Sequence, residues 1–553
     1  MNLTISKKWP FFSWLLALTL ASPFAAIVWQ SFANDQDIFN HLYQTVLPDY
    51  IFNSFALTVA VVAIATLIGV PCAWLIANYE FPLRRYFQWA LILPLAMPSY
   101  VVAFVYTDLL ECAGPIQTSL RQLLEPDTVG THCYFQVRNL GGASLMLALV
   151  LFPYIYLLMR ACFNEQSSSL INSARVMGCN TWQTFYRLSF PLARPALAVG
   201  ITLVAMETLA DFAVVKYFAV STLTTAVYDT WLGYGSLAAA ARISAIMLLA
   251  IFLLIGIEKY ARRQQKYYQH AVGQETIVRP KLKRPQQIIT LLFLSIVFFA
   301  AFLFPFLRLI EFAFDYFSES WNAEFIEYSL NSLLVASLVS LFCLLFGLIF
   351  GYYKRLSQSK TREVPGKLAS AGYALPGTVL AIGVLIPLTM MDSGVNSLFK
   401  SMGTSGPGLI LSGSLFAIIF GYVIRFSAIA VGSVDASLAK VPPSLDMAST
   451  TMGLSPLKTM FKVHMPLVSK GLFVAALLVF IESMKELPAA LLLRPFGFES
   501  LATYVYQFVS DEQLELGALA AIVIVVVGLI PLIFLDKYLD STQPSNSKHA
   551  KRQ

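Results

Sequence analysis

The chain has 553 residues, of which 57% are hydrophobic and 12% charged, and its mean hydropathy is +0.68. A soluble globular protein is nearer half apolar and a quarter charged, so this composition excludes that class. The formal net charge is +7, from 38 basic and 31 acidic residues, and the placement of the basic residues along the chain argues against nucleic acid as a partner.

Apolar blocks of about 20 residues recur along the whole chain, and each is long enough to cross a hydrocarbon core roughly 30 Å thick. The blocks show no period-two alternation, so membrane strands are not expected. We therefore predict an all-α polytopic membrane protein with about twelve transmembrane helices. The predicted spans are 11–31, 53–78, 88–110, 142–163, 196–219, 237–258, 287–309, 331–353, 368–391, 411–432, 471–493 and 515–536.

Two lysines, Lys7 and Lys8, precede the first span, which therefore also has features of a cleaved signal peptide. Its apolar run is longer than a usual signal core, which favours a retained helix. Lys and Arg gather in alternate loops, for example at Arg84 and Arg85, whereas the intervening loops hold few. This asymmetry is typical of the positive-inside rule and predicts that both termini lie in the cytoplasm.

One outer loop, between the third and fourth spans, contains Cys112 and Cys133. An outward-facing pair of this kind favours a disulfide bond that closes the loop. The alternative is two unpaired thiols.

Two polar segments interrupt the apolar pattern, residues 169–192 and residues 444–467. They align at an offset of 275 (444 minus 169), with seven of 24 positions identical. The identical pairs are Ser169/Ser444, Leu170/Leu445, Met177/Met452, Gly178/Gly453, Thr184/Thr459, Pro191/Pro466 and Leu192/Leu467. By the charge asymmetry, both segments lie in the cytoplasm.

Each polar segment is predicted to form a short helix, a tight turn and a second helix. Ser169 and Ser444 are the expected N-caps of the short helices. Gly178 and Gly453 are expected to adopt the left-handed conformation that ends them.

The second helix of each segment is expected to begin at a polar cap, Asn180 or Ser455, followed in the second copy by Pro456. Pro191 and Pro466 are expected to end it.

The short helices carry one apolar face each, formed by Leu170, Ala174 and Met177 in the first copy. Leu445, Ala448 and Met452 form nearly the same face in the second copy. A helix this short is unstable alone in water and needs a surface to pack against. Such a loop could cover its own bundle, but two copies on one side of the membrane favour docking onto a two-fold partner.

The repetition extends beyond the polar segments. Asn53-Ser54 corresponds to Asn331-Ser332, at an offset of 278, and the segment 223–228 corresponds to 501–506. We therefore predict two homologous six-helix halves with parallel topology. The predicted domains are the first half 1–260 with a docking loop at 165–195, a charged linker at 261–286, and the second half 287–553 with a docking loop at 433–470.

Four acidic residues lie near the middle of the fifth and eleventh spans, at equivalent places in the two halves: Glu207, Asp211, Glu482 and Glu486. Residues four apart share a helix face, and acids at membrane depth usually face a polar pathway or a partner. A carboxylate lining suits a hard cation. The alternative is a structural role, with Lys485 neutralising one of the second pair and Lys216 pairing with Asp211.

Motifs for chemistry within this chain are missing from the sequence. There is no Gly-x-x-x-x-Gly-Lys-[Ser/Thr] phosphate loop, and the five histidines are scattered. We expect no catalytic residues, no bound cofactor and no stable metal site.

The two polar segments resemble the cytoplasmic signature loop of ABC-importer permeases, which contains Glu-Ala-Ala, a later Gly and then Leu/Phe-Pro. The resemblance spans essentially all twelve helices, and it implies that each short helix docks in a groove of a separate ATPase subunit. The Glu-Ala-Ala positions fall on residues 172–174 and 447–449, and neither copy keeps the glutamate. The glycines and apolar contacts are therefore the expected anchors.

Residues 206–218, 434–446 and 484–506 resemble the fused permeases of ferric-iron importers. This resemblance implies a permease of the bacterial inner membrane that works by alternating access with Fe3+ as its transported substrate. Its implied partners are two copies of a cytoplasmic ABC ATPase, which would use ATP and Mg2+, a periplasmic ferric-binding protein and the lipid bilayer.

Other functions remain open from the sequence. A permease for thiamine, phosphonate or another small solute is the nearest alternative, although an anion would predict basic rather than acidic residues along the path. An ion-coupled secondary transporter would use the acids as ion sites and need no ATPase. A membrane scaffold without transport would leave the matched acids unexplained.

Overall fold

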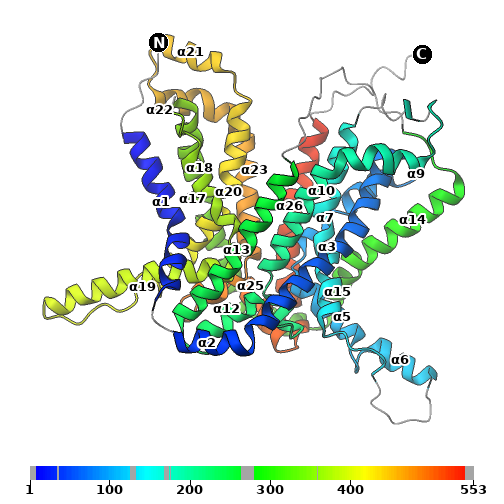
Figure 1. Cartoon of the computed structure of the whole chain (residues 1–553), viewed down its shortest axis with the longest axis horizontal. Coiled ribbons are helices and arrows are strands. Elements are labelled where there is room, and N and C mark those ends of the chain that lie inside the picture. Colours follow the sequence, from blue (N-terminus) through cyan, green and yellow to red (C-terminus); the bar gives the residue numbers. More distant parts are fainter. Residues whose placement is uncertain are drawn as a thin grey trace. The chain divides into compact units, whose positions relative to one another are not determined.

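The computed structural model describes residues 8–33, 36–124, 133–166, 173–174, 176–262, 279–357 and 359–541. Within these ranges the secondary structure is helical, apart from one isolated bridge between Glu80 and Lys281. The helices pack into two compact units. Figure 1 shows the helices in chain order, and each unit is described separately below.

The larger unit comprises residues 27–321 and 505–522. Its helices are α2 (Gln36–Thr45), α3 (Leu47–Asn78), α4 (Arg84–Ala90), η1 (Leu93–Ala96), α5 (Ser99–Leu110), α6 (Pro115–Leu124), α7 (Leu140–Glu165), α9 (Thr181–Thr184), η2 (Phe185–Ser189), α10 (Phe190–Ala210), α11 (Ala213–Tyr217), α12 (Leu223–Leu232), α13 (Leu237–Arg262), α14 (Arg284–Phe298), η3 (Phe299–Leu303), α15 (Phe304–Asp315) and α16 (Phe317–Ser320). The core of this unit is the packing of α3, α7 and α10 against one another.

The second unit comprises residues 1–26, 322–504 and 523–553. It contains the first part of α1 (Lys8–Ser31), then α17 (Ala323–Leu356), α18 (Val364–Ser370), η4 (Ala371–Ala374), α19 (Gly377–Ser401), α20 (Leu415–Ala439), α21 (Pro443–Thr451), α22 (Pro456–Thr459), η5 (Met460–His464), α23 (Met465–Lys485) and α24 (Pro488–Leu493). Like α1, two further helices cross the boundary between units, α25 (Leu501–Ser510) and α26 (Leu514–Ser541). In this unit α17, α20 and α23 form the core.

Each core contains an equivalent close approach of two helices, as the internal repeat predicts. Gly69 of α3 lies so close to α7 that an added Cβ would sit 3.0 Å from the carbonyl oxygen of Phe152. Gly347 of α17 lies equally close to α20, where an added Cβ would sit 3.1 Å from the carbonyl oxygen of Ala430. Small residues of this kind let membrane helices approach closely.

The repeated Asn-Ser pair has a matching role in each half. The Ser54 hydroxyl accepts a hydrogen bond from the backbone N–H of Leu223 at 2.9 Å, and the Ser332 hydroxyl accepts one from Leu501 at 2.7 Å. Each serine therefore satisfies a free amide at the start of a later helix, α12 or α25. The repeated segments at 53–54 and 223–228 thus contain the two partners of one hydrogen bond, the serine acceptor and the amide donor, and the second half repeats both.

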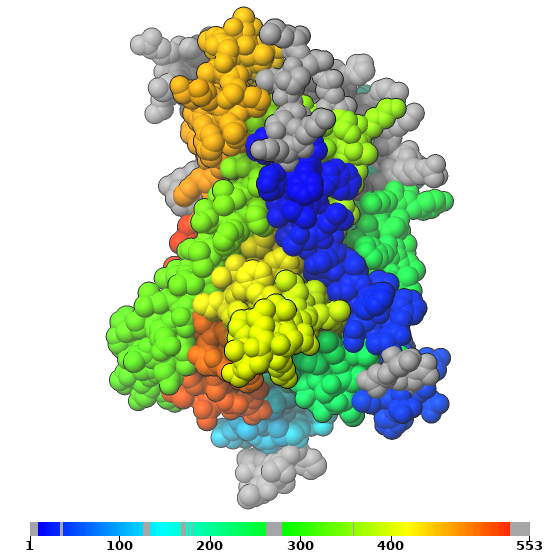
Figure 2. All heavy atoms as spheres, turned by 90° about the vertical axis from the view of Figure 1, so that its left-hand side faces the viewer, coloured from blue at the N-terminus to red at the C-terminus, as the bar shows by residue number. Residues whose placement is uncertain are grey.

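The compact units differ from the sequence repeats at their first helices. The first part of α1 belongs to the unit built from the second repeat, where Trp9, Phe12 and Leu15 line an apolar groove of about 670 Å³ with α17. Helices α14 and α15 belong to the other unit, where the Tyr106 hydroxyl donates to the carbonyl oxygen of Ala300 at 2.6 Å. Figure 2 shows the face that carries α1, in blue, and the projecting end of α19, in yellow.

Ten helices of the described chain are long and apolar enough to cross a membrane, or eleven if one bent pair forms a single span. The predicted span 88–110 is that bent pair, with a 95° angle between residues 84–96 and 99–124. Met97, which precedes Pro98, is extended (φ −93°, ψ 129°), because a residue before proline is driven out of the α region.

Several predicted boundaries were wrong. The span predicted at 196–219 ends at Ala210, and the one at 471–493 ends at Lys485. The span predicted to start at 368 starts at Gly377. The last predicted span, 515–536, lies within α26 (Leu514–Ser541) and agrees with the structure.

Candidate functional site

The second polar segment forms the predicted helix, turn and helix. Helix α21 is followed by Gly453 in the left-handed conformation (φ +74°), which ends a helix without a Cβ clash. Ser455 then caps α22, its hydroxyl accepting from the backbone N–H of Lys458 at 3.4 Å, with Pro456 at the first helical position.

The first polar segment has the same geometry where it is described. Gly178 is left-handed (φ +84°), and Asn180 exchanges hydrogen bonds with Gln183, the reciprocal pairing of a capping box. Ser169 and Leu170 lie outside the described residues, so the N-terminal part of this short helix is not described.

The prediction that Ser444 caps the short helix was wrong. The helix begins at Pro443, with Pro442 at the cap position, so Ser444 is already inside the helix and its side chain is exposed. Two successive prolines explain the shift, since proline is tolerated in a first turn, where N–H groups have no intrahelical partner.

The prediction that Pro191 and Pro466 end the second helices was also wrong, because both lie within continuous helices. A π-helical turn precedes each proline, at η2 and at η5, and the N–H of Phe190 bonds to the carbonyl oxygen of Phe185. This wider turn accommodates a residue that lacks an N–H and would clash with the carbonyl four residues earlier. The two turns begin at equivalent positions, Phe185 and Met460, so both halves use the same device.

The predicted apolar faces are corrected as well. Ala174 is buried and Leu445 packs on the core of its own unit, whereas Met177, Ala448 and Met452 are exposed. The outward face of α21 therefore contains Met447 and Ala448, and Met452, the residue that caps its C-terminal end, extends this face.

Two further pairs of exposed apolar side chains lie at the offset that aligns the polar segments, and the sequence analysis missed them. They are Trp182 with Leu457, and Tyr186 with Phe461. In each half the two side chains are four residues apart and so share one helix face. This spacing of large apolar residues occurs at matching positions of the two aligned segments, so it could have been found from the sequence. With the exposed methionines Met177 and Met452, they form what we call the exposed apolar set.

The four acids fall into two classes. Asp211 is the residue at which α10 ends, and its carboxylate accepts from Ser99 Oγ at 2.8 Å and from the Val214 N–H at 2.9 Å. Glu486 ends α23 in the same way, accepting from the Ala489 N–H at 3.2 Å and pairing with Arg425 at 3.1 Å. Both acids connect a membrane helix to the short helix that follows it.

The prediction that the acids share helix faces was therefore wrong, because each helix ends before the second acid of its pair. Asp211 and Glu486 are in extended conformations, with ψ of 132° and 118°. Lys485 pairs with Glu482 at 3.1 Å, whereas Lys216 pairs with Asp229 at 2.8 Å rather than with Asp211. Glu207 and Glu482, one turn before the helix ends, are both partly exposed.

No group of three or more His, Cys, Asp or Glu side chains suited to a metal ion occurs in the described ranges.

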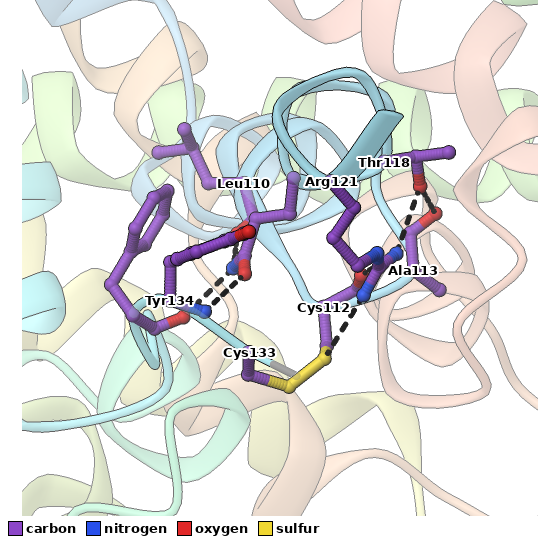
Figure 3. The surroundings of a disulfide bond; sticks show 9 residues. Leu110, Cys112, Ala113, Thr118, Arg121, Cys133 and Tyr134 are labelled. Carbon is purple, nitrogen blue, oxygen red and sulfur yellow. Dashed lines mark hydrogen bonds between the residues drawn. A yellow bond between two sulfur atoms is a disulfide. The ribbon is translucent and has the colours of Figure 1, made fainter. Parts of the chain in front are cut away.

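Cys112 and Cys133 form a disulfide bond, at the place where the sequence favours one (Figure 3). Arg121 donates to the Cys112 carbonyl oxygen at 2.7 Å. Gln117, which is buried, donates to the carbonyl oxygens of Leu110 and Phe135. The disulfide and these hydrogen bonds together attach α6 to the segment that leads into α7.

The chain matches a family described as "Binding-protein-dependent transport system inner membrane component" twice, over residues 65–266 and 343–543. These two regions contain the two polar segments, in agreement with the internal repeat. Together they cover more than half of the chain.

Curated relatives extend over most of the chain. It is 24% identical over 510 residues to the Fe(3+)-transport system permease protein FbpB 2 of Haemophilus influenzae, covering 90% of this chain and 91% of that protein. It is 25% identical over 487 residues to the ferric transport system permease protein FbpB of Actinobacillus pleuropneumoniae, covering 83% of this chain and 66% of that protein.

A shorter relative matches part of the chain. The molybdenum transport system permease protein ModB of Escherichia coli K12 is 25% identical over 228 residues, which are 39% of this chain but 96% of that protein.

Proposed function

Because this chain belongs to the family of binding-protein-dependent transport system inner membrane components, we propose that it is the permease of an ATP-driven importer of ferric iron. It is a multi-pass inner-membrane protein with two permease repeats. Two copies of a cytoplasmic ABC ATPase, which hydrolyse ATP with Mg2+, supply the energy. The chain itself binds no cofactor and performs no catalysis.

The observation that carries this proposal is the matched docking geometry of the two repeats. In each, a left-handed glycine, a short capped helix and a π-helical turn present methionine and a second large apolar side chain to the outside. Exposed apolar side chains on an otherwise polar segment are typical of a protein interface, and methionine adapts well to such surfaces. Two equivalent surfaces suit two equal subunits.

Docking gives ATP hydrolysis a mechanical route into the membrane. When the ATPase subunits close, the docked short helices move with them, and the continuous helices α9–η2–α10 and α22–η5–α23 carry that movement toward Glu207 and Glu482. The two repeats rock between outward-facing and inward-facing states, and the ion delivered by a periplasmic binding protein crosses. Both termini lie in the cytoplasm, on the same side as the docking surfaces.

Ferric iron is proposed as substrate on two grounds. The relatives that cover most of this chain carry ferric-transport names. Fe3+ is a hard cation that prefers oxygen ligands, and Glu207 and Glu482 supply partly exposed carboxylates at equivalent places in the two repeats.

An oxyanion is the second candidate substrate, because a shorter relative is named a molybdenum permease. The test is reconstitution of the chain in liposomes with its ATPase and with binding protein loaded with iron, molybdate, thiamine or phosphonate. We expect stimulated ATP hydrolysis and uptake with the iron-loaded protein. Equal stimulation by another loaded protein would refute the substrate, and uptake driven by an ion gradient without ATPase would refute the importer.

A further inference from the structure

The second docking helix, α21, is attached to α17 through Arg355. The guanidinium of Arg355 lies against the carboxylate of Asp446, with Nε at 2.9 Å and Nη2 at 2.8 Å from Oδ2. The same guanidinium donates to the carbonyl oxygens of Leu438 at 2.6 Å and Val441 at 3.0 Å. One side chain thus holds the end of α20, the connection to α21 and the first turn of α21.

The other carboxylate oxygen of Asp446 is 2.6 Å from Nε2 of His464. His464 belongs to the π-helical turn η5 and is 1% exposed. Asp446 therefore receives one partner from α17 and one from η5. We call Arg355, Asp446 and His464 the ionic triad.

Two neutral contacts complete the attachment. The Tyr352 hydroxyl donates to the carbonyl oxygen of Pro456 at 2.6 Å, and Thr459 Oγ1 donates to Ser449 Oγ at 3.1 Å. Hydrogen bonds to charged groups are shorter and stronger than neutral ones, so the triad supplies the stronger part of the attachment. Together with the two neutral contacts, it holds α21, α22, η5 and the end of α17 as one body.

The first repeat has different chemistry at the same positions. At the offset that aligns the polar segments, Asp446 corresponds to Ile171 and His464 to Ser189. At the offset that aligns the Asn-Ser pairs, Arg355 corresponds to Ala77. None of these three residues of the first repeat has a charged side chain, so they cannot form a salt bridge, and Ile171 lies outside the described residues.

In place of the triad, the first repeat packs aromatic rings. Trp74, which corresponds to Tyr352, has its ring centroid 5.1 Å from that of Phe163 and 5.0 Å from that of Phe185. Trp182 and Tyr186 extend this cluster. Aromatic packing is less directional than a set of charged hydrogen bonds, so it tolerates small rotations of the docking element.

We propose that the two docking elements are functionally unequal, and that the ionic triad makes Arg355, Asp446 and His464 positioning residues for the second one. The triad keeps α21 fixed to α17, so that a displacement of α21 by the ATPase moves α17 and α20 directly. In the described part of the first docking element the contacts are aromatic packing and neutral hydrogen bonds, such as the one that Gln166 Nε2 donates to the Ser189 carbonyl oxygen at 2.9 Å, and these transmit the same displacement less rigidly. This inference rests on the proposed function, since it concerns the same ATPase contact.

The test compares spin labels at equivalent exposed positions, Met177→Cys and Met452→Cys, in the full-length chain carrying Cys162→Ser and Cys179→Ser. Asp446→Asn removes the charge at nearly constant shape, and His464→Gln keeps the Arg355–Asp446 pair as a milder second variant. We expect both variants to increase the mobility of the label at 452 and to leave the label at 177 unchanged. This measurement needs no ATPase.

The second readout is ATP hydrolysis stimulated by loaded binding protein in liposomes. We expect each variant to bind the ATPase yet lose stimulation about fivefold or more, the lower range of an allosteric coupling. Ser189→Ala, at the position equivalent to His464, and Lys354→Gln, in the neighbouring half-exposed pair with Asp435, are matched controls that should keep full stimulation.

The proposal of unequal docking elements is refuted if both triad variants leave the mobility of the label at 452 and the stimulated ATP hydrolysis unchanged. It is also refuted if the mobility of the label at 177 increases by the same amount. Failure of the proposed function has a different signature. In that case the unmodified chain would not bind the ATPase, whatever the labels report.

Discussion

Glu486 and Glu482 lie four positions apart in the sequence, yet replacing Glu486 with glutamine should destabilise the protein far more than replacing Glu482. Glu486 is a buried partner of Arg425, with side chains 6% and 12% exposed. Removing one partner of a buried ion pair costs about 3–5 kcal/mol, because the other charge remains buried without compensation. In Glu486→Gln the amide oxygen can still accept from the Ala489 N–H, so we take the lower value, about 3 kcal/mol.

Glu482 is 40% exposed and pairs with Lys485 one turn away. Exposed pairs of this kind contribute about 0–1 kcal/mol, so Glu482→Gln should change stability little. A cooperative unit of roughly 150–250 residues, the size of the compact unit that contains both glutamates, shifts by about 2–4 °C per kcal/mol. Glu486→Gln should therefore lower the melting temperature of that unit by about 6–12 °C, and Glu482→Gln by less than about 4 °C.

The assay is thermal unfolding of the detergent-solubilised protein, followed by size-exclusion chromatography. Asp211→Asn is the matched control from the first repeat. The donors to Asp211 are the neutral Ser99 hydroxyl and a backbone amide, whereas Glu486 pairs with the charged guanidinium of Arg425. It should lower the melting temperature less than Glu486→Gln does. A normal melting temperature for Glu486→Gln, or a larger drop for Glu482→Gln, would refute the structural assignment of Glu486.

Three further outcomes are expected. Met177→Lys combined with Met452→Lys should abolish co-purification of the ATPase without changing the melting temperature, and retained binding would exclude these methionines from the interface. Ser54→Ala and Ser332→Ala should each destabilise the protein by about 0.5–2 kcal/mol, measured by thermal unfolding, because each leaves a helix-start amide without its acceptor; a neutral result in both would show that water replaces the hydroxyl. Cys133→Ser should change migration on non-reducing gels and cost about 2–4 kcal/mol, and unchanged migration of the variant relative to the unmodified protein would show that the bond does not form in cells.

Pattern and repetition were enough to predict the helical class, the two repeats and the helix–turn–helix form of the polar segments. The alignment of 169–192 with 444–467 placed Gly178 and Gly453 correctly, because a left-handed helix end is a local property of glycine. Composition likewise located most membrane helices, because a hydrocarbon core requires long apolar runs.

Local reasoning failed where a neighbouring element decided the outcome. Proline at 191 and 466 is a helix terminator by propensity, but a π-helical turn absorbs it in both repeats. Leu445 was predicted on an outward face, yet it packs on the core of its own unit. Neither result follows from the residues alone, since each depends on what packs against the helix.

Hydropathy, charge asymmetry and glycine placement are properties of consecutive residues, and they suffice to identify a repeated helical membrane protein with two matched polar segments. The roles of the acids and the assignment of the first helices to the units emerge only in the folded chain. Glu486 is buried in an ion pair because Arg425, on another helix, meets it, and Asp446 is part of a triad because Arg355 reaches it from α17. Such contacts join residues that are distant in the chain, so they depend on packing, and no spacing along the sequence encodes them.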